Sequence, residues 1–377
     1  MSHPTHKNIG IIGLGIIGRG VTATLRSKGF QVFVWNRTPR PVPNFVGSPA
    51  ELAELCDYIQ IFVSDDEALL QTVQRLSEKL APQHIVIAHS TVAPDSARAA
   101  AEIIERRGAR FVEAPLTGSK IAAEKGELVY YVAGSDAALR EARPVLEATS
   151  KQIIVIGEIG QAAAIKIATN MITAASVQAV AEAFGLVQAL RVPLEKFVEA
   201  MQANASHSTT LAMKMPNMMK RDFEPHFSVK HMLKDMRIAN QLALSNYLEL
   251  SVTAAARDRL LEQMQWGHED EDYSAVARKY LPKIVPVTNK EAQTGGQEAQ
   301  ADGDGIAAVS EPAASPRELE EPKLKGENSQ MATGEATAPA LPTEEVKEET
   351  QLPGGFLKQL LRRGRQLLKR SVSSKEG

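Results

Sequence analysis

The chain has 377 residues. This length suits two compact domains and a tail, because a single domain usually holds about 100 to 200 residues. Hydrophobic residues make up 44% and charged residues 23%, as in ordinary globular proteins, and a net charge of -2 gives no general attraction to nucleic acid. The single cysteine, Cys56, excludes an internal disulfide and lies in no metal-ligand spacing, so we expect no metal site and a reducing compartment. Since no apolar signal core precedes the first predicted strand, we expect a cytoplasmic protein.

The first part of the chain, to about Gly157, alternates short β-branched runs with helical stretches. This alternation is typical of parallel α/β units and predicts a Rossmann-type domain over residues 1–159. The expected strands are Asn8–Ile12, Gln31–Trp35, Tyr58–Val63, His84–Ala88, Arg110–Val112, Leu128–Val132 and Ile153–Ile156.

After Gly160 the alternation stops, and Gln161–Leu190 is expected to form one long, alanine-rich helix. Further helices follow, so we predict an all-helical domain for substrate binding and dimerisation over residues 160–286. The apolar surface of the long helix favours a homodimer or a homotetramer.

The last part of the chain has a different composition. Residues 288–352 contain no aromatic residue and are rich in Gly, Pro, Glu, Ser and Thr, which predicts a disordered acidic linker over 287–352. Within the tail, 353–377, the segment Phe356–Arg370 separates apolar from basic residues as an amphipathic helix does. Such a helix suits an anionic membrane surface or a protein partner, and binding back to the acidic linker is equally open. Without interleaved aromatic residues we expect no nucleic-acid partner.

A glycine-rich turn follows the first predicted strand and opens a helix. Glycines at this place let the backbone approach a pyrophosphate, which then faces the free N–H groups of the helix N-terminus. The motif alone is weak, and a plain strand-to-helix turn is the alternative, but strand, turn, helix and second strand occur in the order that the motif requires. We therefore assign the whole turn to a dinucleotide site: Gly13, Leu14, Gly15, Ile16, Ile17 and Gly18.

The end of the second predicted strand indicates which dinucleotide binds. NAD sites place a carboxylate there, yet this chain has no Asp or Glu before Glu51. Arg37 stands in its place and can pair with a 2′-phosphate, while Asn36 and Thr38 can add hydrogen bonds. We therefore predict NADP(H) as the cofactor. Two residues at the end of the third predicted strand are assigned to the same site: Val63 and Ser64.

Lys166 is the only charged residue between Glu158 and Glu182, on an otherwise apolar helix. Asn170 follows one turn later on the same face, so both groups can reach one ligand. Burial lowers the pKa of a lysine, which suits it to donate a proton to a carbonyl oxygen as hydride reaches the carbon. From composition alone, a structural lysine at a domain boundary explains the residue equally well.

The order of five motifs resembles that of the β-hydroxyacid dehydrogenase family, over residues 7 to about 280. The motifs are the turn Gly13–Gly18, the pair Ser90-Thr91, the segment Glu113–Ser119, the helix start Gly160 with Lys166 and Asn170, and the pair Lys234-Asp235.

This resemblance implies a role for each matching residue. Lys166 would be the catalytic acid/base and Asn170 would orient the substrate. The substrate carboxylate would be held by Thr117, Gly118 and Ser119, with Phe227 beside the substrate. Thr91 and Lys234 would lie near the nicotinamide and its ribose, and Asp235 would steady that region. Any one of these polar residues taken alone is more simply a loop or helix-cap group.

The chain departs from the family pattern at two positions. Thr117 replaces a serine, which keeps the hydroxyl and adds a methyl group to the pocket. Ser119 replaces a second glycine, and together with the segment Trp35–Thr38 this looks more like the NADPH-dependent glyoxylate and succinic semialdehyde reductases. We therefore expect an NADPH-dependent reductase of small carboxylate-bearing aldehydes to hydroxyacids. A 3-hydroxyisobutyrate or tartronate semialdehyde dehydrogenase is the alternative of the same class. A non-catalytic, dehydrogenase-like scaffold acting through its tail is the alternative of another class, and retention of Lys166 argues against it.

Overall fold

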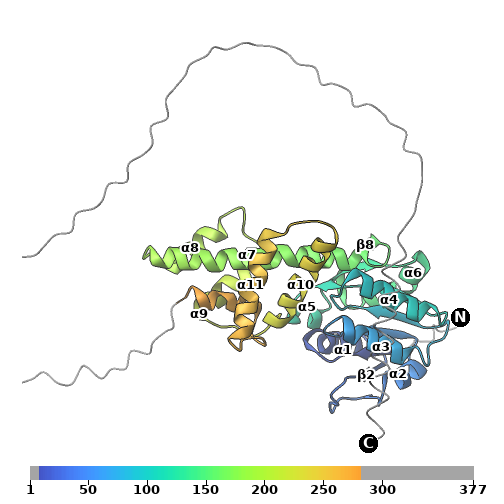
Figure 1. The fold of residues 1–377 in the computed structure, drawn as a ribbon. Helices are drawn as coiled ribbons and strands as arrows, with labels where there is room; N and C mark the ends of the chain where they lie inside the picture. Colours follow the sequence, from blue (N-terminus) through green and yellow to red (C-terminus); the bar gives the residue numbers. More distant parts are fainter. Residues whose placement is uncertain (1–7, 282–377) are drawn as a thin grey trace, which may run out of the picture. The chain divides into compact units, whose positions relative to one another are not determined.

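The structure, a computed structural model, describes residues 8–281, in which an α/β half is followed by a helical half (Figure 1). The strands are β1 (Ile9–Ile12), β2 (Val32–Trp35), β3 (Tyr58–Ile61), β4 (Ile85–Ala88), β5 (Arg110–Glu113), β6 (Leu116–Thr117), β7 (Leu128–Ala133) and β8 (Ser150–Gly157). The helices among them are α1 (Ile16–Ser27), α2 (Pro49–Leu55), α3 (Asp66–Leu76), α4 (Pro94–Glu105), α5 (Lys120–Lys125) and α6 (Asp136–Glu147).

The strands form one sheet in the order β2-β1-β3-β4-β5-β7-β6, with β8 beside β7. The first five strands are parallel, whereas β7 runs antiparallel to both β5 and β6. The chain leaves β1 for β2 on one side and returns to β3 on the other. A dinucleotide typically binds at the carboxyl end of the sheet where the strand order reverses in this way.

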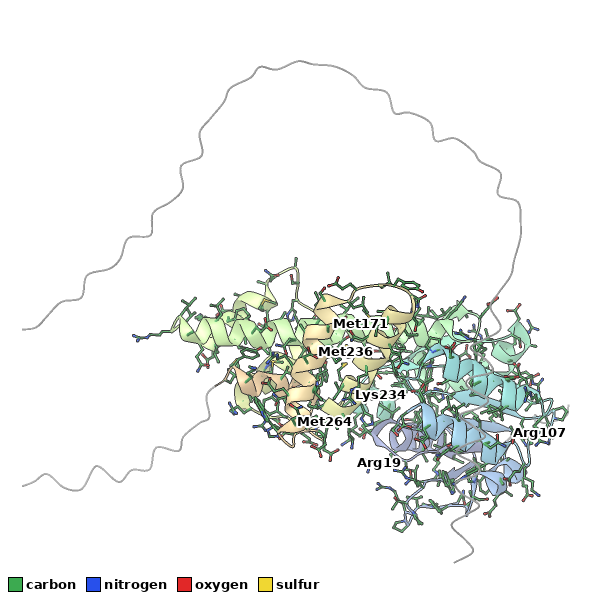
Figure 2. All side chains as sticks on the ribbon, viewed as in Figure 1. Arg19, Arg107, Met171, Lys234, Met236 and Met264 are labelled. Carbon is green, nitrogen blue, oxygen red and sulfur yellow. The ribbon has the colours of Figure 1, made fainter. Side chains whose placement is uncertain are left out.

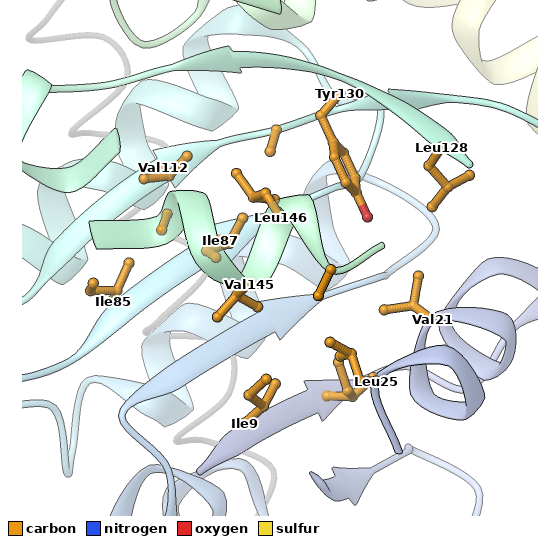
Figure 3. Packing of buried hydrophobic residues seen from close by; sticks show 14 of the residues in the cluster. Ile9, Val21, Leu25, Ile85, Ile87, Val112, Leu128, Tyr130, Val145 and Leu146 are labelled. Atoms are coloured by element: carbon orange, nitrogen blue, oxygen red, sulfur yellow. The ribbon is translucent and has the colours of Figure 1, made fainter. Parts of the chain in front are cut away.

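Alternating residues of each strand supply two cores, because neighbouring side chains point to opposite faces of a sheet. On one face Ile9 and Ile87 pack with Leu25 of α1 and Leu146 of α6 (Figure 3). On the other face Ile59 and similar strand residues pack with α2, α3 and α4. With both faces covered, the strands are almost continuously apolar, as parallel strands usually are.

The helical half consists of α7 (Gln161–Ala189), α8 (Leu194–Gln202), α9 (Thr209–Lys220), α10 (Val229–Ser245), α11 (Ser251–Gln265) and the 3₁₀ helix η1 (Tyr273–Lys279). By length and composition α7 is the one helix in residues 8–281 that is apolar enough to cross a membrane. Such helices are also common in protein cores, and Val177, Ala181 and Phe184 of α7 pack in the core of the helical half. Figure 2 shows Lys234 of α10 on the side of this half that faces the α/β half.

The predicted fold class is confirmed for the described residues. All seven expected strands are present, and the long helix begins at the expected residue and ends at Ala189, one residue early. The two-residue strand β6 was not predicted, and β8 begins at Ser150, three residues before the expected start. The predictions for the linker and for the tail lie outside the described residues.

Candidate active site

Three glycines of the first turn differ in what the fold requires of them. Gly13 has a φ of 97°, and a Cβ there would lie 2.0 Å from the Phe62 carbonyl oxygen. A Cβ on Gly18 would lie 2.0 Å from the Gly13 carbonyl oxygen. Gly15 has an ordinary φ of -69°, and a Cβ there would meet no protein atom within 4 Å. The fold therefore needs Gly13 and Gly18, whereas Gly15 keeps open the space in front of the α1 N-terminus, where a phosphate binds in such turns.

Asn36 connects this turn to the end of β2. Its Oδ1 accepts a hydrogen bond of 2.9 Å from the Leu14 backbone N–H, and its Nδ2 donates one of 2.7 Å to the Thr38 carbonyl. Asn36 is thus occupied with holding the two loops together. Arg37 and Thr38 are exposed next to it, so the Arg37 guanidinium is available to an anion.

The ends of β3 and β4 are linked in the same way. The Val63 N–H donates to the Ser90 hydroxyl at 3.0 Å, and the exposed Ser64 donates to the Asp65 carboxylate at 2.6 Å. The next residue after Ser90, Thr91, accepts a hydrogen bond through its carbonyl from Lys234 Nζ of α10. The loop after β4 therefore joins the α/β half to the helical half.

Lys166 lies in a hydrogen-bonded chain that joins two helices. Its Nζ donates to Asn170 Oδ1 at 2.9 Å, and Asn170 Nδ2 donates to Asp235 Oδ2 at 2.6 Å. Lys234 Nζ forms an ion pair with the other Asp235 oxygen, Oδ1, at 2.8 Å. The structure thus brings together the four residues predicted for the reacting end, and Thr91 joins them through Lys234.

The surroundings of Lys166 set its proton affinity. Burial lowers the pKa of Lys166 to about 8, the nearby Asp235 carboxylate opposes this shift and the Lys234 charge adds to it. The residue is half-buried, so solvent still reaches part of it. A lysine with a pKa close to neutral pH can give and take protons at a useful rate.

Glu113 holds the helix that carries Lys166. Its carboxylate, 2% exposed at the end of β5, accepts hydrogen bonds from the N–H groups of Gly160 at 2.6 Å and Ala163 at 2.8 Å. Burial raises the pKa of Glu113, and these N–H groups oppose the shift. A carboxylate at a helix N-terminus also interacts favourably with the helix dipole. Lys166 therefore has a defined position relative to the sheet.

The residues predicted to bind the substrate carboxylate follow Glu113. Thr117 is exposed in β6, and Gly118 has a φ of 144°, which a residue with a side chain rarely adopts. The Ser119 hydroxyl accepts the Ala122 N–H at 3.2 Å and so caps α5. Its own proton remains available to a ligand. Through Glu113 this loop is tied to the lysine helix.

Phe227, predicted to lie beside the substrate, packs against α10. Its ring stacks on that of His231, with the ring centroids 5.9 Å apart. His231 precedes Lys234 and Asp235 by three and four residues, so it lies on the same face of α10 as that pair. The structure therefore brings Phe227 to the helix that carries Lys234 and Asp235.

Two features of the helical half are not among the residues predicted from the sequence. The first is His231. Its position one helical turn before Lys234 and Asp235 could have placed it on the same helix face as that pair. The second is a buried ion pair of 2.7 Å between Lys214 and Asp272, which 58 residues separate. No spacing in the sequence indicates this second pair.

The arrangement combines an open glycine turn with a lysine of lowered pKa. Such a site can hold a dinucleotide at the sheet edge and exchange a proton with a substrate oxygen beside it. In residues 8–281 no cluster of His, Cys, Asp and Glu suits a metal ion. Fold and site together define a nicotinamide-dependent oxidoreductase.

Comparisons with known proteins identify the family. The NAD binding domain of 6-phosphogluconate dehydrogenase matches residues 8–157, and the NAD-binding domain of NADP-dependent 3-hydroxyisobutyrate dehydrogenase matches residues 160–280. Glyoxylate/succinic semialdehyde reductase 1 of Arabidopsis thaliana is 32% identical over 278 residues, which cover 71% of this chain and 96% of that protein. The chain belongs to the β-hydroxyacid dehydrogenase family and is a hydroxyacid dehydrogenase or reductase that uses a nicotinamide cofactor.

Two further relatives differ in how much of their length is matched. The 3-hydroxyisobutyrate dehydrogenase of Mycobacterium tuberculosis, solved with L-serine, has a TM-score of 0.66 and 25% identity, covering 73% of this chain and 99% of that one. The human cytokine-like nuclear factor N-PAC is 30% identical over 288 residues, which are 74% of this chain. The match spans only 52% of N-PAC.

Replacing Gly15 by alanine separates cofactor binding from folding. The new methyl group meets no protein atom, so the free energy of unfolding should change by at most about 1 kcal/mol. Affinity for the nicotinamide cofactor should fall about tenfold or more, because the methyl group would enter the space that a phosphate takes in such turns. Gly13→Ala is the matched control and should lose both stability and binding. Unchanged affinity of Gly15→Ala for both NADH and NADPH, measured by fluorescence titration, would exclude this turn as the phosphate site.

The pH dependence of turnover in the reductive direction tests the charges around Lys166. If the Lys166 ammonium group is the proton donor, turnover should fall as pH rises through about 8, because the ammonium group loses its proton there. Asp235→Asn removes a charge that favours the ammonium and should move this fall to lower pH. Lys234→Met removes a like charge and should move it to higher pH. The measurement is kcat against pH at a saturating concentration of the reduced nicotinamide cofactor. An unmoved profile in both variants would contradict a role of Lys166 as proton donor.

Proposed function

We propose that the chain is an NADPH-dependent reductase of small carboxylate-bearing aldehydes, with glyoxylate and succinic semialdehyde as substrates. The observation that carries the proposal is the chain from Lys166 through Asn170 to Asp235, with its lowered lysine pKa. The name of the Arabidopsis relative supports this substrate class. In the same proposal, residues 1–159 bind the cofactor and residues 160–286 bind the substrate. The protein is a homodimer or a homotetramer and lies in the cytoplasm.

The proposed reaction needs one hydride and one proton. Bound NADPH would supply the hydride to the aldehyde carbon. Lys166 gives a proton to the carbonyl oxygen, which becomes the hydroxyl group, and then takes a proton from solvent. Asn170 orients the substrate, while Thr117, Gly118 and Ser119 hold its carboxylate through hydroxyl and N–H groups. Phe227 bounds the substrate, and Thr91, Lys234 and Asp235 fix the nicotinamide end.

The preference for NADPH rests on the end of β2. Arg37 is exposed there, and the sequence has no Asp or Glu before Glu51 that could bond the ribose hydroxyls from the end of β2. Asn36 holds this loop in place through its hydrogen bonds to the Leu14 N–H and the Thr38 carbonyl.

The direct test is NADPH oxidation by the purified full chain with glyoxylate, succinic semialdehyde, methylmalonate semialdehyde and tartronate semialdehyde, with NADH in parallel. We expect the fastest turnover with one of the first two and NADPH. Faster turnover of either of the others would favour the 3-hydroxyisobutyrate or tartronate semialdehyde alternative. Tight NADPH binding without any turnover would favour the non-catalytic scaffold. The name of one relative, the human cytokine-like nuclear factor N-PAC, describes a nuclear factor and not an enzyme.

Arg37→Asp tests the cofactor preference. Loss of charge-assisted hydrogen bonds of about 1.5 to 3 kcal/mol should raise the KM for NADPH roughly tenfold to a hundredfold, and the KM for NADH should not rise. Arg40→Asp, in the same loop and also exposed, makes the same change of charge and should have little effect. Equal effects of both variants would show that positive charge in this loop attracts the cofactor nonspecifically, and that Arg37 makes no direct contact with the 2′-phosphate.

A further inference from the structure

Lys214 and Asp272 form a buried ion pair within the helical half. Lys214 is 1% and Asp272 2% exposed, and Lys214 Nζ lies 2.7 Å from both carboxylate oxygens. Removing two charges from water is costly, and apolar residues often stabilise a core as well as such a pair does. A role in fixing geometry would explain why the pair is present.

Asp272 also holds the loop that ends in Phe227. Besides Lys214, its carboxylate accepts the backbone N–H groups of His226 at 3.1 Å and Phe227 at 3.2 Å. The Ser274 hydroxyl adds a bond of 2.7 Å. One carboxylate thus joins α9, η1 and the segment before α10.

The aromatic contacts extend this connection towards Lys166. The Phe227 ring meets Tyr273 edge-on at 6.2 Å and stacks on His231 at 5.9 Å. His231 is held by the Ser228 hydroxyl at 2.7 Å. His231 shares a face of α10 with Asp235. The stacked rings of Phe227 and His231 therefore end beside Asp235, which is hydrogen-bonded through Asn170 to Lys166.

We propose that the Lys214–Asp272 pair is a positioning device that holds Phe227 and His231 against the aldehyde and so sets how tightly the substrate binds. This inference rests on the proposed function. The pair has no hydrogen bond to Lys166 or to the glycine turn, so its loss should change substrate binding more than the chemical step.

The test is the double variant Lys214→Met/Asp272→Asn of the full chain, which leaves no unpaired buried charge. We expect the KM for the aldehyde to rise about tenfold, with kcat and the Kd for NADPH within about threefold of wild type. The control is Lys230→Met/Asp270→Asn, which removes an exposed pair of 2.5 Å between neighbouring segments. Exposed pairs contribute little, so the control should keep the wild-type KM.

Phe227→Leu supplies the second measurement. If the pair acts through Phe227, adding Phe227→Leu to the double variant should raise KM no further, whereas independent effects would multiply. Should the double variant not fold, Lys214→Arg keeps the charge, changes the geometry and allows the same comparison. An unchanged KM in folded variants, or multiplied effects, would overturn the inference. Absence of turnover in the wild type would instead contradict the proposed function.

Discussion

The bonds between Glu113 and the N-terminus of α7 are the interaction on which the site depends. Glu113 ends a central strand, and its buried carboxylate accepts two N–H groups that a helix N-terminus otherwise leaves unpaired. Charge-assisted bonds of this kind are about twice as strong as neutral ones. They fix the first turns of α7 against the sheet, and Lys166 follows shortly after on the same helix.

Lys166 then receives its properties from the helical half. Asn170 and Asp235 join α7 to α10, and Lys234 of α10 reaches back to Thr91 of the α/β half. The same few residues therefore set the pKa of the lysine and connect the two halves. Burial and the Lys234 charge favour release of the proton, while Asp235 keeps the ammonium populated near neutral pH.

Much of the fold was predictable, because buried parallel strands and an apolar helix leave clear patterns. The four-residue spacing of Lys166 and Asn170 predicted that their side chains lie together on one helix, and a hydrogen bond of 2.9 Å joins them. The structural difference between Gly13 and Gly15 was not predictable. It depends on the carbonyl group of Phe62, which follows another strand and lies where a side chain on Gly13 would be. The bond from Leu14 to Asn36 and the Lys214–Asp272 pair likewise arise from contacts between distant segments.

Chemical rescue of Lys166→Ala tests proton donation by Lys166 most directly. The variant should bind NADPH as the wild type does, and its turnover should fall about a hundredfold or more. Added methylammonium should restore turnover in proportion to its concentration, whereas tetramethylammonium, which carries charge but no transferable proton, should not. Turnover near that of the wild type without added amine would contradict the role of Lys166.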